Sequence, residues 1–277
     1  MSYEFRHATC NEGFKDWDFA LACRTIRRIG YTGIELAPFT LAQDATTLTA
    51  EQRRHYRSII EAEGLRFVGL HWLLVGPEGI HVTTPERAVR ERSWRYVDGL
   101  IDLCADLGPG GVLVFGSPKQ RSSTGGISPA EAKKHFIEGL AGLAEHAAQR
   151  GVIIAVEALS PDQTDVVTSL EEAVEVVRAV GSEAVRTMFD THNAVRETEP
   201  HDALVERHFG LIRHIHVNEM DGRHPGAGDY DFKPLLRVLQ RRNYSGWVSL
   251  EAFDFAPGPD KVVEASLRYL EAQIAQL

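Results

Sequence analysis

The sequence predicts a single (β/α)8 barrel, an α/β fold in which one domain spans residues 1–277. Short runs with strand character alternate with longer helical patterns from one end of the chain to the other. Eight such units follow in succession, the number that closes a parallel barrel. The length of 277 residues suits one α/β barrel, and no linker divides the chain.

The expected strands are short apolar runs bounded by turn residues. In order, they are residues 4–10, 33–37, 66–72, 111–117, 152–159, 185–191, 212–218 and 246–252. An open, doubly wound sheet is the alternative, but neither a G-x-G-x-x-G motif nor a P-loop follows any of these runs. The pattern therefore favours the closed barrel.

The expected helices lie between the strands, at residues 17–30, 47–63, 85–107, 129–150, 169–180, 202–209, 231–242 and 259–275. The first five end at glycines, which commonly terminate helices: Gly30, Gly64, Gly108, Gly151 and Gly181. Two helix starts are indicated by an N-cap residue followed by proline, namely Thr84-Pro85 and Ser128-Pro129.

Composition argues against several classes of protein. The formal net charge of −9 disfavours a nucleic-acid partner, because phosphates require a clustered basic face. Cys10, Cys23 and Cys104 form no C-x-x-C motif and predict neither a disulfide framework nor a zinc knuckle. The first residues lack the pattern of a secretory signal, and no apolar run is long enough to cross a membrane. We expect a cytoplasmic protein with no membrane partner.

Four ionisable residues are expected to face the barrel interior at the carboxyl ends of consecutive strands, where such barrels keep their active sites. Successive strand side chains point in opposite directions, and the apolar neighbours of these four should face the helices. The four residues are Glu157, Asp190, His216 and Glu251. A single glutamate at the end of a strand is usually a solvated loop residue. Four ionisable residues that all point inward from adjacent strands favour a shared site instead.

A divalent cation would make this cluster favourable. Unpaired charges are costly inside a barrel, and three carboxylates repel one another strongly where the dielectric constant is low. Three carboxylates and an imidazole suit a hard or borderline ion. We expect Mn²⁺ first, with Mg²⁺, Co²⁺ and Zn²⁺ as alternatives.

Three further residues should point into the barrel by the same alternation: Glu35, His71 and His214. We expect Glu35 to bind a substrate hydroxyl or to pair with Arg6 or His7. His71 ends the third expected strand and is a candidate for substrate binding. His214 precedes His216 on the same face and should line the interior, support His216 or pack in the core.

Trp72 has two interpretations. By alternation its side chain should face the helices, but a side chain at the end of a strand can also turn into the site. In the second case it would form an aromatic wall against the C–H face of a sugar.

The second half of the chain carries a series of motifs in a specific order. They are V-E-A-L around Glu157, F-D-T-H-N around Asp190, H-I-H-V-N-E at 214–219, H-P-G-A-G-D-Y-D-F at 224–232, and N-Y-S-G-W-V-S-L-E-A-F around Glu251. With these motifs the chain resembles the sugar phosphate isomerase/epimerase superfamily of xylose isomerase-like TIM barrels. Within it, the chain is most similar to the D-tagatose 3-epimerase-like ketose 3-epimerases.

The resemblance implies a metal-dependent isomerase that acts on a small sugar, and relatives often form dimers or tetramers. It assigns Glu157, Asp190, His216 and Glu251 as the metal ligands. It also assigns Glu157 and Glu251 as the acid/base groups that move a proton next to a ketose carbonyl through an enediolate.

Two positions depart from the ketose 3-epimerase pattern. A substrate-binding histidine follows the ligand aspartate by three residues in those enzymes, whereas His192 follows Asp190 by two. An arginine stands six residues after their ligand histidine, where this chain has Gly222 beside Arg223. We expect His192 and Arg223 to serve as substitutes, or the substrate to differ.

The departures leave other activities open. A hydroxypyruvate isomerase, an inosose dehydratase, or a lyase or other enzyme acting on a keto-glycoside would use the same metal core. An endonuclease IV-like nuclease is less favoured, because the fourth expected strand offers no histidine for an additional zinc ion. A non-catalytic sugar-binding barrel is less favoured because both glutamates are present.

Overall fold

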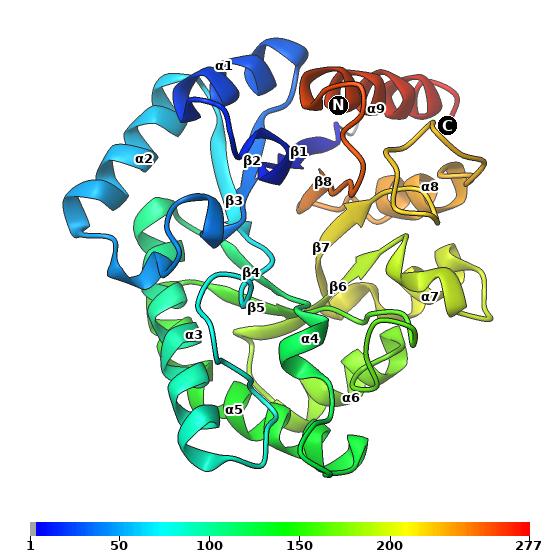
Figure 1. The fold of residues 1–277 in the computed structure, drawn as a ribbon. Helices are drawn as coiled ribbons and strands as arrows, with labels where there is room; N and C mark the ends of the chain where they lie inside the picture. The colour runs from blue at the N-terminus through cyan, green and yellow to red at the C-terminus, as the bar shows by residue number, and fades with distance from the viewer. Residues whose placement is uncertain (1–3) are drawn as a thin grey trace.

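The computed structural model describes residues 4–277, and its eight parallel strands form a closed barrel in the order β1 to β8 (Figure 1). The strands are β1 Arg6–Cys10, β2 Gly33–Leu36, β3 Arg66–Leu70, β4 Val112–Phe115, β5 Ile153–Val156, β6 Val185–Asp190, β7 Ile212–Val217 and β8 Trp247–Leu250. β1 pairs with β8 so that Ala8 lies opposite Ser249, which closes the ring. The predicted (β/α)8 barrel is confirmed.

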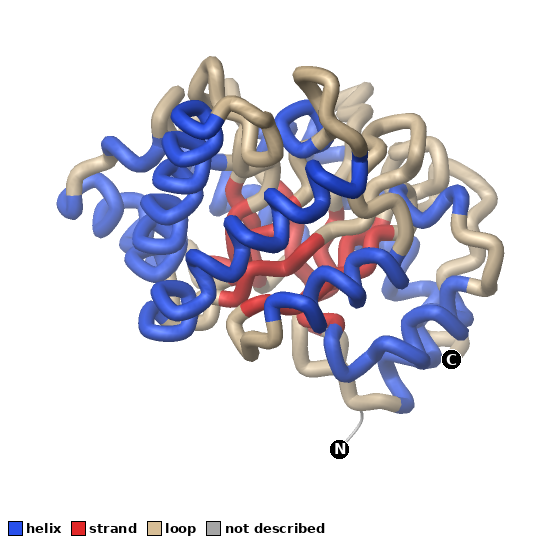
Figure 2. Tube along the Cα trace, turned by 90° about the horizontal axis from the view of Figure 1, so that it is seen from below, coloured by secondary structure: helices blue, strands red, loops and turns tan. Residues whose placement is uncertain are grey.

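Helices surround the strands, as the tube view shows (Figure 2). They are α1 Phe19–Ile29, α2 Ala50–Ala62, α3 Arg87–Leu107, α4 Pro118–Arg121, α5 Pro129–Arg150, α6 Leu170–Val180, α7 His201–His208, α8 Lys233–Arg241 and α9 Pro259–Ile274. The short α4 helix, directly after β4, was not predicted. Short 3-10 turns lie at Glu12–Phe14, Pro38–Thr40, Ala45–Thr47, Asn193–Arg196 and Phe209–Leu211.

The two predicted helix starts have different outcomes. The hydroxyl of Ser128 accepts a hydrogen bond from the Glu131 amide at 3.2 Å, so α5 begins as predicted. The predicted start at Thr84 is wrong, because α3 begins after Glu86. The Thr84 hydroxyl instead accepts a hydrogen bond from the Glu86 amide at 3.3 Å, within the turn that leads into the helix.

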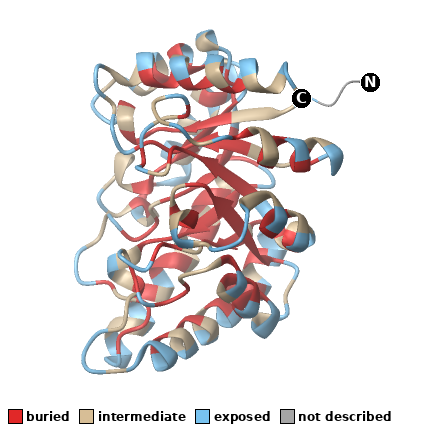
Figure 3. Ribbon diagram, turned by 90° about the vertical axis from the view of Figure 1, so that its right-hand side faces the viewer, coloured by how far each residue is buried: buried red, intermediate tan, exposed pale blue. Residues whose placement is uncertain are grey.

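Apolar residues fill the space between strands and helices, and buried residues concentrate there in Figure 3. A third, smaller cluster lies on inward-facing positions of β4, β5 and β6 and comprises Val112, Val114, Ala155 and Met188. The carboxyl ends of the strands carry the polar residues instead. Among residues 4–277, none of the helices combines the length and apolar character needed to cross a membrane.

Candidate active site

Four side chains converge where β5, β6, β7 and β8 end: Glu157, Asp190, His216 and Glu251. One potential ligand atom from each lies within 4.8 Å of the others. The Nδ1 atom of His216 is 3.2 Å from Glu251 Oε2, 3.6 Å from Asp190 Oδ2 and 3.9 Å from Glu157 Oε1. All four residues are at most 5% exposed, so the structure brings the predicted cluster together in the barrel interior.

The donor set of this cluster fits a divalent cation. The buried Nδ1 atom of His216 has no hydrogen-bond partner within the described part of the chain, although three carboxylates surround it. A nitrogen lone pair and carboxylate oxygens are ligands that such ions accept. A cation would also relieve the repulsion among the buried carboxylates. These four residues could therefore hold a metal ion.

The pKa values of the two glutamates in the cluster are shifted in opposite directions. Burial and the nearby negative charges of Glu251 and Asp190 raise the pKa of Glu157 well above its ordinary value. Burial alone would also raise the pKa of Glu251, but the His216 imidazole outweighs it and lowers that pKa. Carboxyl groups whose pKa values are pushed apart in this way can serve as an acid and a base in one site.

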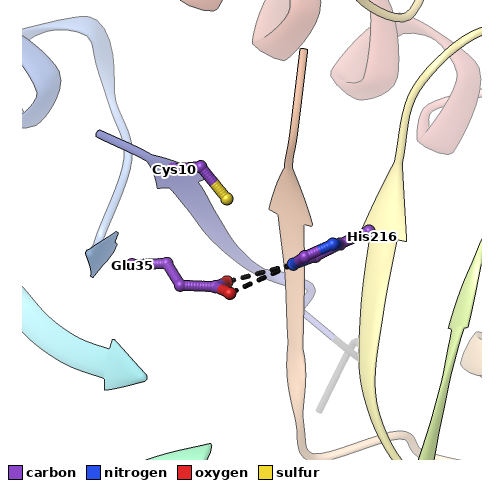
Figure 4. Close-up of side chains that lie close together, drawn as sticks. All are labelled: Cys10, Glu35 and His216. Atoms are coloured by element: carbon purple, nitrogen blue, oxygen red, sulfur yellow. Dashed lines mark hydrogen bonds and ion pairs between the residues drawn. The ribbon is translucent and has the colours of Figure 1, made fainter. Parts of the chain in front are cut away.

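Glu35 contacts the Nε2 atom of His216, the ring nitrogen opposite the one that faces the cluster (Figure 4). Its Oε1 atom is 3.1 Å from His216 Nε2, and its Oε2 atom is 2.8 Å from His214 Nε2. Glu35 and both histidines are fully buried. The carboxylate of Glu35 thus binds the two histidines rather than Arg6 or His7. His214 likewise supports Glu35 and is not in a position to meet substrate.

Cys10 lies beside Glu35 and His216 in Figure 4. Its sulfur atom lies within 4.8 Å of a carboxylate oxygen of Glu35 and of a ring nitrogen of His216. The same sulfur is 3.9 Å from the Ser249 hydroxyl. Burial, followed by the Glu35 charge, raises the pKa of the thiol to about 11. Cys10 is therefore a neutral, buried neighbour of the pair at ordinary pH.

His71 belongs to the same buried network. Its Nε2 atom is 2.8 Å from Glu12 Oε2, and its Nδ1 atom is 3.6 Å from Glu35 Oε1. Burial alone would lower the pKa of His71, but Cys10 and Glu12 raise it well above its ordinary value. The sequence did not point to Glu12, which lies just beyond β1. His71 therefore connects two buried carboxylates, and its expected role as a substrate ligand is not supported by this position.

Trp72 turns into the site, against the alternation of the strand. Its backbone adopts a left-handed conformation with a φ of 51°, which redirects the side chain after β3. The indole Nε1 donates a hydrogen bond to Glu251 Oε1 at 2.8 Å. The ring stacks between Phe39 and Phe253, with centroid distances of 6.0 and 6.1 Å. We refer to Phe39, Trp72 and Phe253 as the aromatic wall.

Residues 23–273 match the family model described as xylose isomerase-like TIM barrel. The chain belongs to the xylose isomerase-like TIM barrel family.

Known proteins of this kind include sugar isomerases and epimerases. A putative hydroxypyruvate isomerase of Streptomyces coelicolor is 27% identical over 244 residues, which cover 83% of each chain. The fructoselysine 3-epimerase of Shigella flexneri is 22% identical over 239 residues, again 83% of each chain. A crystal structure of D-psicose 3-epimerase in the presence of D-fructose superposes with a TM-score of 0.83 at 18% identity and covers 98% of this chain and 99% of that one. The chain is thus an isomerase-type enzyme of the sugar isomerase/epimerase group, as predicted.

Asn193, three residues after Asp190, is a residue of the site that the sequence did not identify. Its Nδ2 donates to Glu157 Oε1 at 3.0 Å, and its backbone amide donates to Asp190 Oδ1 at 2.8 Å. Gln163 in turn donates to Asn193 Oδ1 at 2.7 Å. Spacing from Asp190 is the signal that could have identified Asn193, because the resemblance places a substrate-binding side chain at that distance.

His192 lies next to the site but turns toward the following loop. Its Nδ1 atom is 2.8 Å from the Met220 carbonyl oxygen, and its ring meets Phe253 edge-on at a centroid distance of 5.3 Å. Its backbone amide donates to Asn218 Oδ1 at 2.8 Å. The half-buried ring thus packs against the aromatic wall, at the edge of the site.

Arg223 does not join the cluster. Its guanidinium binds the Asp221 carboxylate at 2.7 Å and is exposed. Gly222 precedes it with a φ of 81°, and a Cβ atom there would lie 2.5 Å from the Phe253 ring. A side chain at residue 222 would therefore displace the aromatic wall. The expectation that Arg223 replaces the arginine of the ketose 3-epimerases is not supported by these contacts.

Proposed function

We propose that this chain is a divalent-metal-dependent sugar isomerase or epimerase that moves a proton next to the carbonyl of a ketose or related keto-polyol. The observation that carries the proposal is the buried Nδ1 atom of His216, which lacks a hydrogen-bond partner within residues 4–277 and faces the carboxylates of Glu157, Asp190 and Glu251. We assign these four residues as the metal ligands, with Mn²⁺ preferred over Mg²⁺, Co²⁺ or Zn²⁺.

A bound divalent cation would withdraw electron density from the substrate carbonyl and make the adjacent C–H bond more acidic. Glu251, whose pKa is lowered chiefly by His216 against the effect of burial, is ionised and accepts the proton at a carboxylate oxygen. Glu157, which ends another strand of the same cluster, is assigned to return a proton to the substrate from its own carboxyl group. Because β5 and β8 lie apart around the ring, the two groups approach the substrate from different sides.

The other side chains of the site prepare these two carboxylates. Trp72 donates to Oε1 of Glu251 and leaves Oε2, which faces His216, for the metal or the substrate. Asn193 donates to Oε1 of Glu157, the oxygen that faces His216, and so fixes the direction of that carboxylate. The aromatic wall would exclude water and contact the C–H face of a sugar. Glu35 would orient His216 rather than contact substrate.

We further propose that residues 1–277 work as one catalytic barrel domain in the cytoplasm. A small sugar, rather than nucleic acid, is the partner that an acidic chain with this buried cluster favours. Association into dimers or tetramers is part of the same proposal and is testable by light scattering.

Dehydration is the second candidate reaction, because it begins with removal of the same kind of proton. The replacement of the expected histidine by Asn193 and of the expected arginine by Gly222 favours a substrate other than a simple ketose. An inosose or a keto-glycoside would fit this alternative. A product that has lost water distinguishes it from isomerisation.

The test is turnover by the purified chain after chelation and reconstitution. Free and phosphorylated ketoses, inososes and keto-glycosides are offered with and without Mn²⁺, and products are identified by NMR. The proposal expects turnover that requires the metal and is lost in Glu157→Gln and Glu251→Gln, while the exposed Arg178→Gln control retains it. Wild-type rates in either glutamine variant would contradict the two-carboxylate mechanism. Sugar binding without turnover would favour a non-catalytic barrel.

A further inference from the structure

The amino-terminal mouth of the barrel, opposite the candidate active site, contains a separate cavity of about 660 Å³. The residues that begin β1, β3, β4, β5 and β8 contribute to its lining. A cavity of this size falls in the range of small-molecule sites. It shares none of its lining residues with the four-residue metal cluster.

The charges around this cavity are predominantly positive. Its lining contains the arginines Arg6, Arg57, Arg66 and Arg213 but one carboxylate, that of Glu61. Glu61 is already paired with Arg57 at 2.8 Å. Within residues 4–277, Arg6, Arg66 and Arg213 form no ion pair with a carboxylate. The cavity is therefore positively charged, although the chain as a whole carries a net charge of −9.

Two of these guanidinium groups are held in place by neutral partners. The Nη1 atom of Arg6 donates to the Ser245 carbonyl at 2.8 Å, and its guanidinium lies 4.1 Å above the centre of the Trp247 ring. The Nη1 atom of Arg213 donates to the Gly210 carbonyl at 2.9 Å. Such bonds orient the groups without neutralising them, so each retains further N–H donors for an anion.

The like charges also act on one another. Burial, followed by the Arg66 charge, lowers the pKa of Arg6. Arg186 lies on β6 beyond the lining, and burial, followed by the Arg213 charge, lowers its pKa. A bound anion would relieve this repulsion. Arginine is the side chain best shaped to bind phosphate through paired N–H donors.

The cavity also has an apolar wall. Leu65, Phe67, Leu107 and Trp247 contribute to the lining together with the arginines. Inorganic phosphate alone would leave this wall without a partner. A wall of this kind suits the organic part of a larger molecule.

We propose that the amino-terminal mouth is a binding site for a small organic molecule that carries a phosphate or diphosphate group. The arginines of the lining bind the phosphate, and the apolar wall contacts the organic part. The site is separate from the metal cluster, and the proposal does not depend on the reaction assigned to that cluster.

Calorimetry with ADP and with inorganic pyrophosphate tests the site, using the full chain after removal of metal so that diphosphate cannot bind a cation. The wild-type chain is expected to bind both probes, with ADP tighter. The Arg66→Gln/Arg213→Gln variant should bind ADP about tenfold more weakly or worse, as expected when charge-assisted hydrogen bonds are lost. Glu61→Gln should bind ADP severalfold more tightly, because it removes the one negative charge of the lining.

The matched control is Arg28→Gln/Arg178→Gln, which removes two exposed arginines from α1 and α6 outside the cavity. Its affinity for ADP should equal that of the wild type, and so should that of Glu251→Gln. The proposal would be overturned if the wild-type chain bound neither probe. It would also be overturned if the two double variants bound ADP equally weakly. Pyrophosphate that binds as tightly as ADP would overturn the role of the apolar wall.

Discussion

His216 Nε2 lies 3.1 Å from Glu35 Oε1, on the side of the imidazole ring that faces away from the three carboxylates. The opposite nitrogen, Nδ1, lies 3.2 Å from Glu251 Oε2. A buried carboxylate that binds one imidazole nitrogen fixes the ring and increases the basicity of the other nitrogen. Glu35 thereby determines the orientation of His216 without taking part in the cluster itself.

The first prediction concerns this relationship. Glu35→Gln retains the size of the side chain but removes its charge, so His216 should bind a cation less well. The dissociation constant for Mn²⁺, measured by calorimetry, should increase about 10- to 100-fold. Glu138→Gln removes an exposed carboxylate from α5 and should leave Mn²⁺ binding unchanged. Equal affinity in the two variants would remove the role assigned to Glu35.

The second prediction concerns the indole of Trp72. Trp72→Phe retains the stacked ring but removes the N–H that donates to Glu251 at 2.8 Å. A hydrogen bond to a carboxylate favours its ionised form, so its loss should raise the pKa of Glu251. The ascending limb of the pH profile of kcat should move to higher pH, and kcat should fall roughly tenfold, as for a lost bond to a charged group.

Phe39→Leu is the matched control for that change, since it alters the aromatic wall and leaves the indole bond in place. It should affect KM more than the pH profile. A pH profile shifted equally in Phe39→Leu and Trp72→Phe would mean that packing, rather than the indole donor, sets the behaviour of Glu251.

The third prediction concerns Asn193, which donates to Glu157 at 3.0 Å. Asn193→Ala should reduce kcat roughly tenfold, the effect of losing about one hydrogen bond to a charged group. Mn²⁺ affinity should change much less, since Asn193 is not a member of the cluster. Steady-state kinetics combined with Mn²⁺ titration separates the two effects. Gln149→Ala on the exposed face of α5 is the control.

The fourth prediction concerns the stability of the metal-free chain. Burial and the neighbouring charges raise the pKa of Glu157, while Glu35 and Glu251 raise that of His216 although burial opposes them. Groups with raised folded-state pKa values stabilise the fold at low pH and lose that contribution as pH increases through those values. The metal-free chain should therefore become less stable from about pH 6 to about pH 8.

Mn²⁺ should reverse this trend, because it replaces the protons of the cluster. The increase in Tm on adding Mn²⁺, measured by scanning calorimetry, should be larger at the higher pH. The His216→Ala variant should show little increase at either pH. An increase that is independent of pH in the wild type would indicate that the cation binds elsewhere.

The succession of eight strand–helix units was sufficient to predict the barrel, and the alternation of side chains along each strand predicted the residues that converge in it. Glu157, Asp190, His216 and Glu251 are near the ends of regular strands, where a side-chain period of two determines direction. The same rule placed Glu35 in the interior, but alternation does not reveal which partner a buried carboxylate finds.

Residues outside regular strands were harder to predict. Trp72 leaves the strand pattern because of a single left-handed residue, which propensity does not reveal. Asn193 lies in a 3-10 turn and Glu12 in another, so their directions follow from loop geometry. Arg223 lies one residue beyond the family position, which Gly222 occupies, and the turn at Gly222 places Arg223 in solvent with Asp221.

The most direct test of the central claim is solvent-proton exchange in D₂O, followed by NMR at each carbon of the substrate. With Mn²⁺ bound, the wild-type chain should introduce deuterium at the carbon next to the carbonyl, at C3 for a 3-epimerase or at C1 for an aldose–ketose isomerase. Chelation, Glu157→Gln and Glu251→Gln should each abolish the label. Turnover of a sugar without any deuterium at that carbon, or labelling that persists in both glutamine variants, would contradict proton transfer by these two carboxylates.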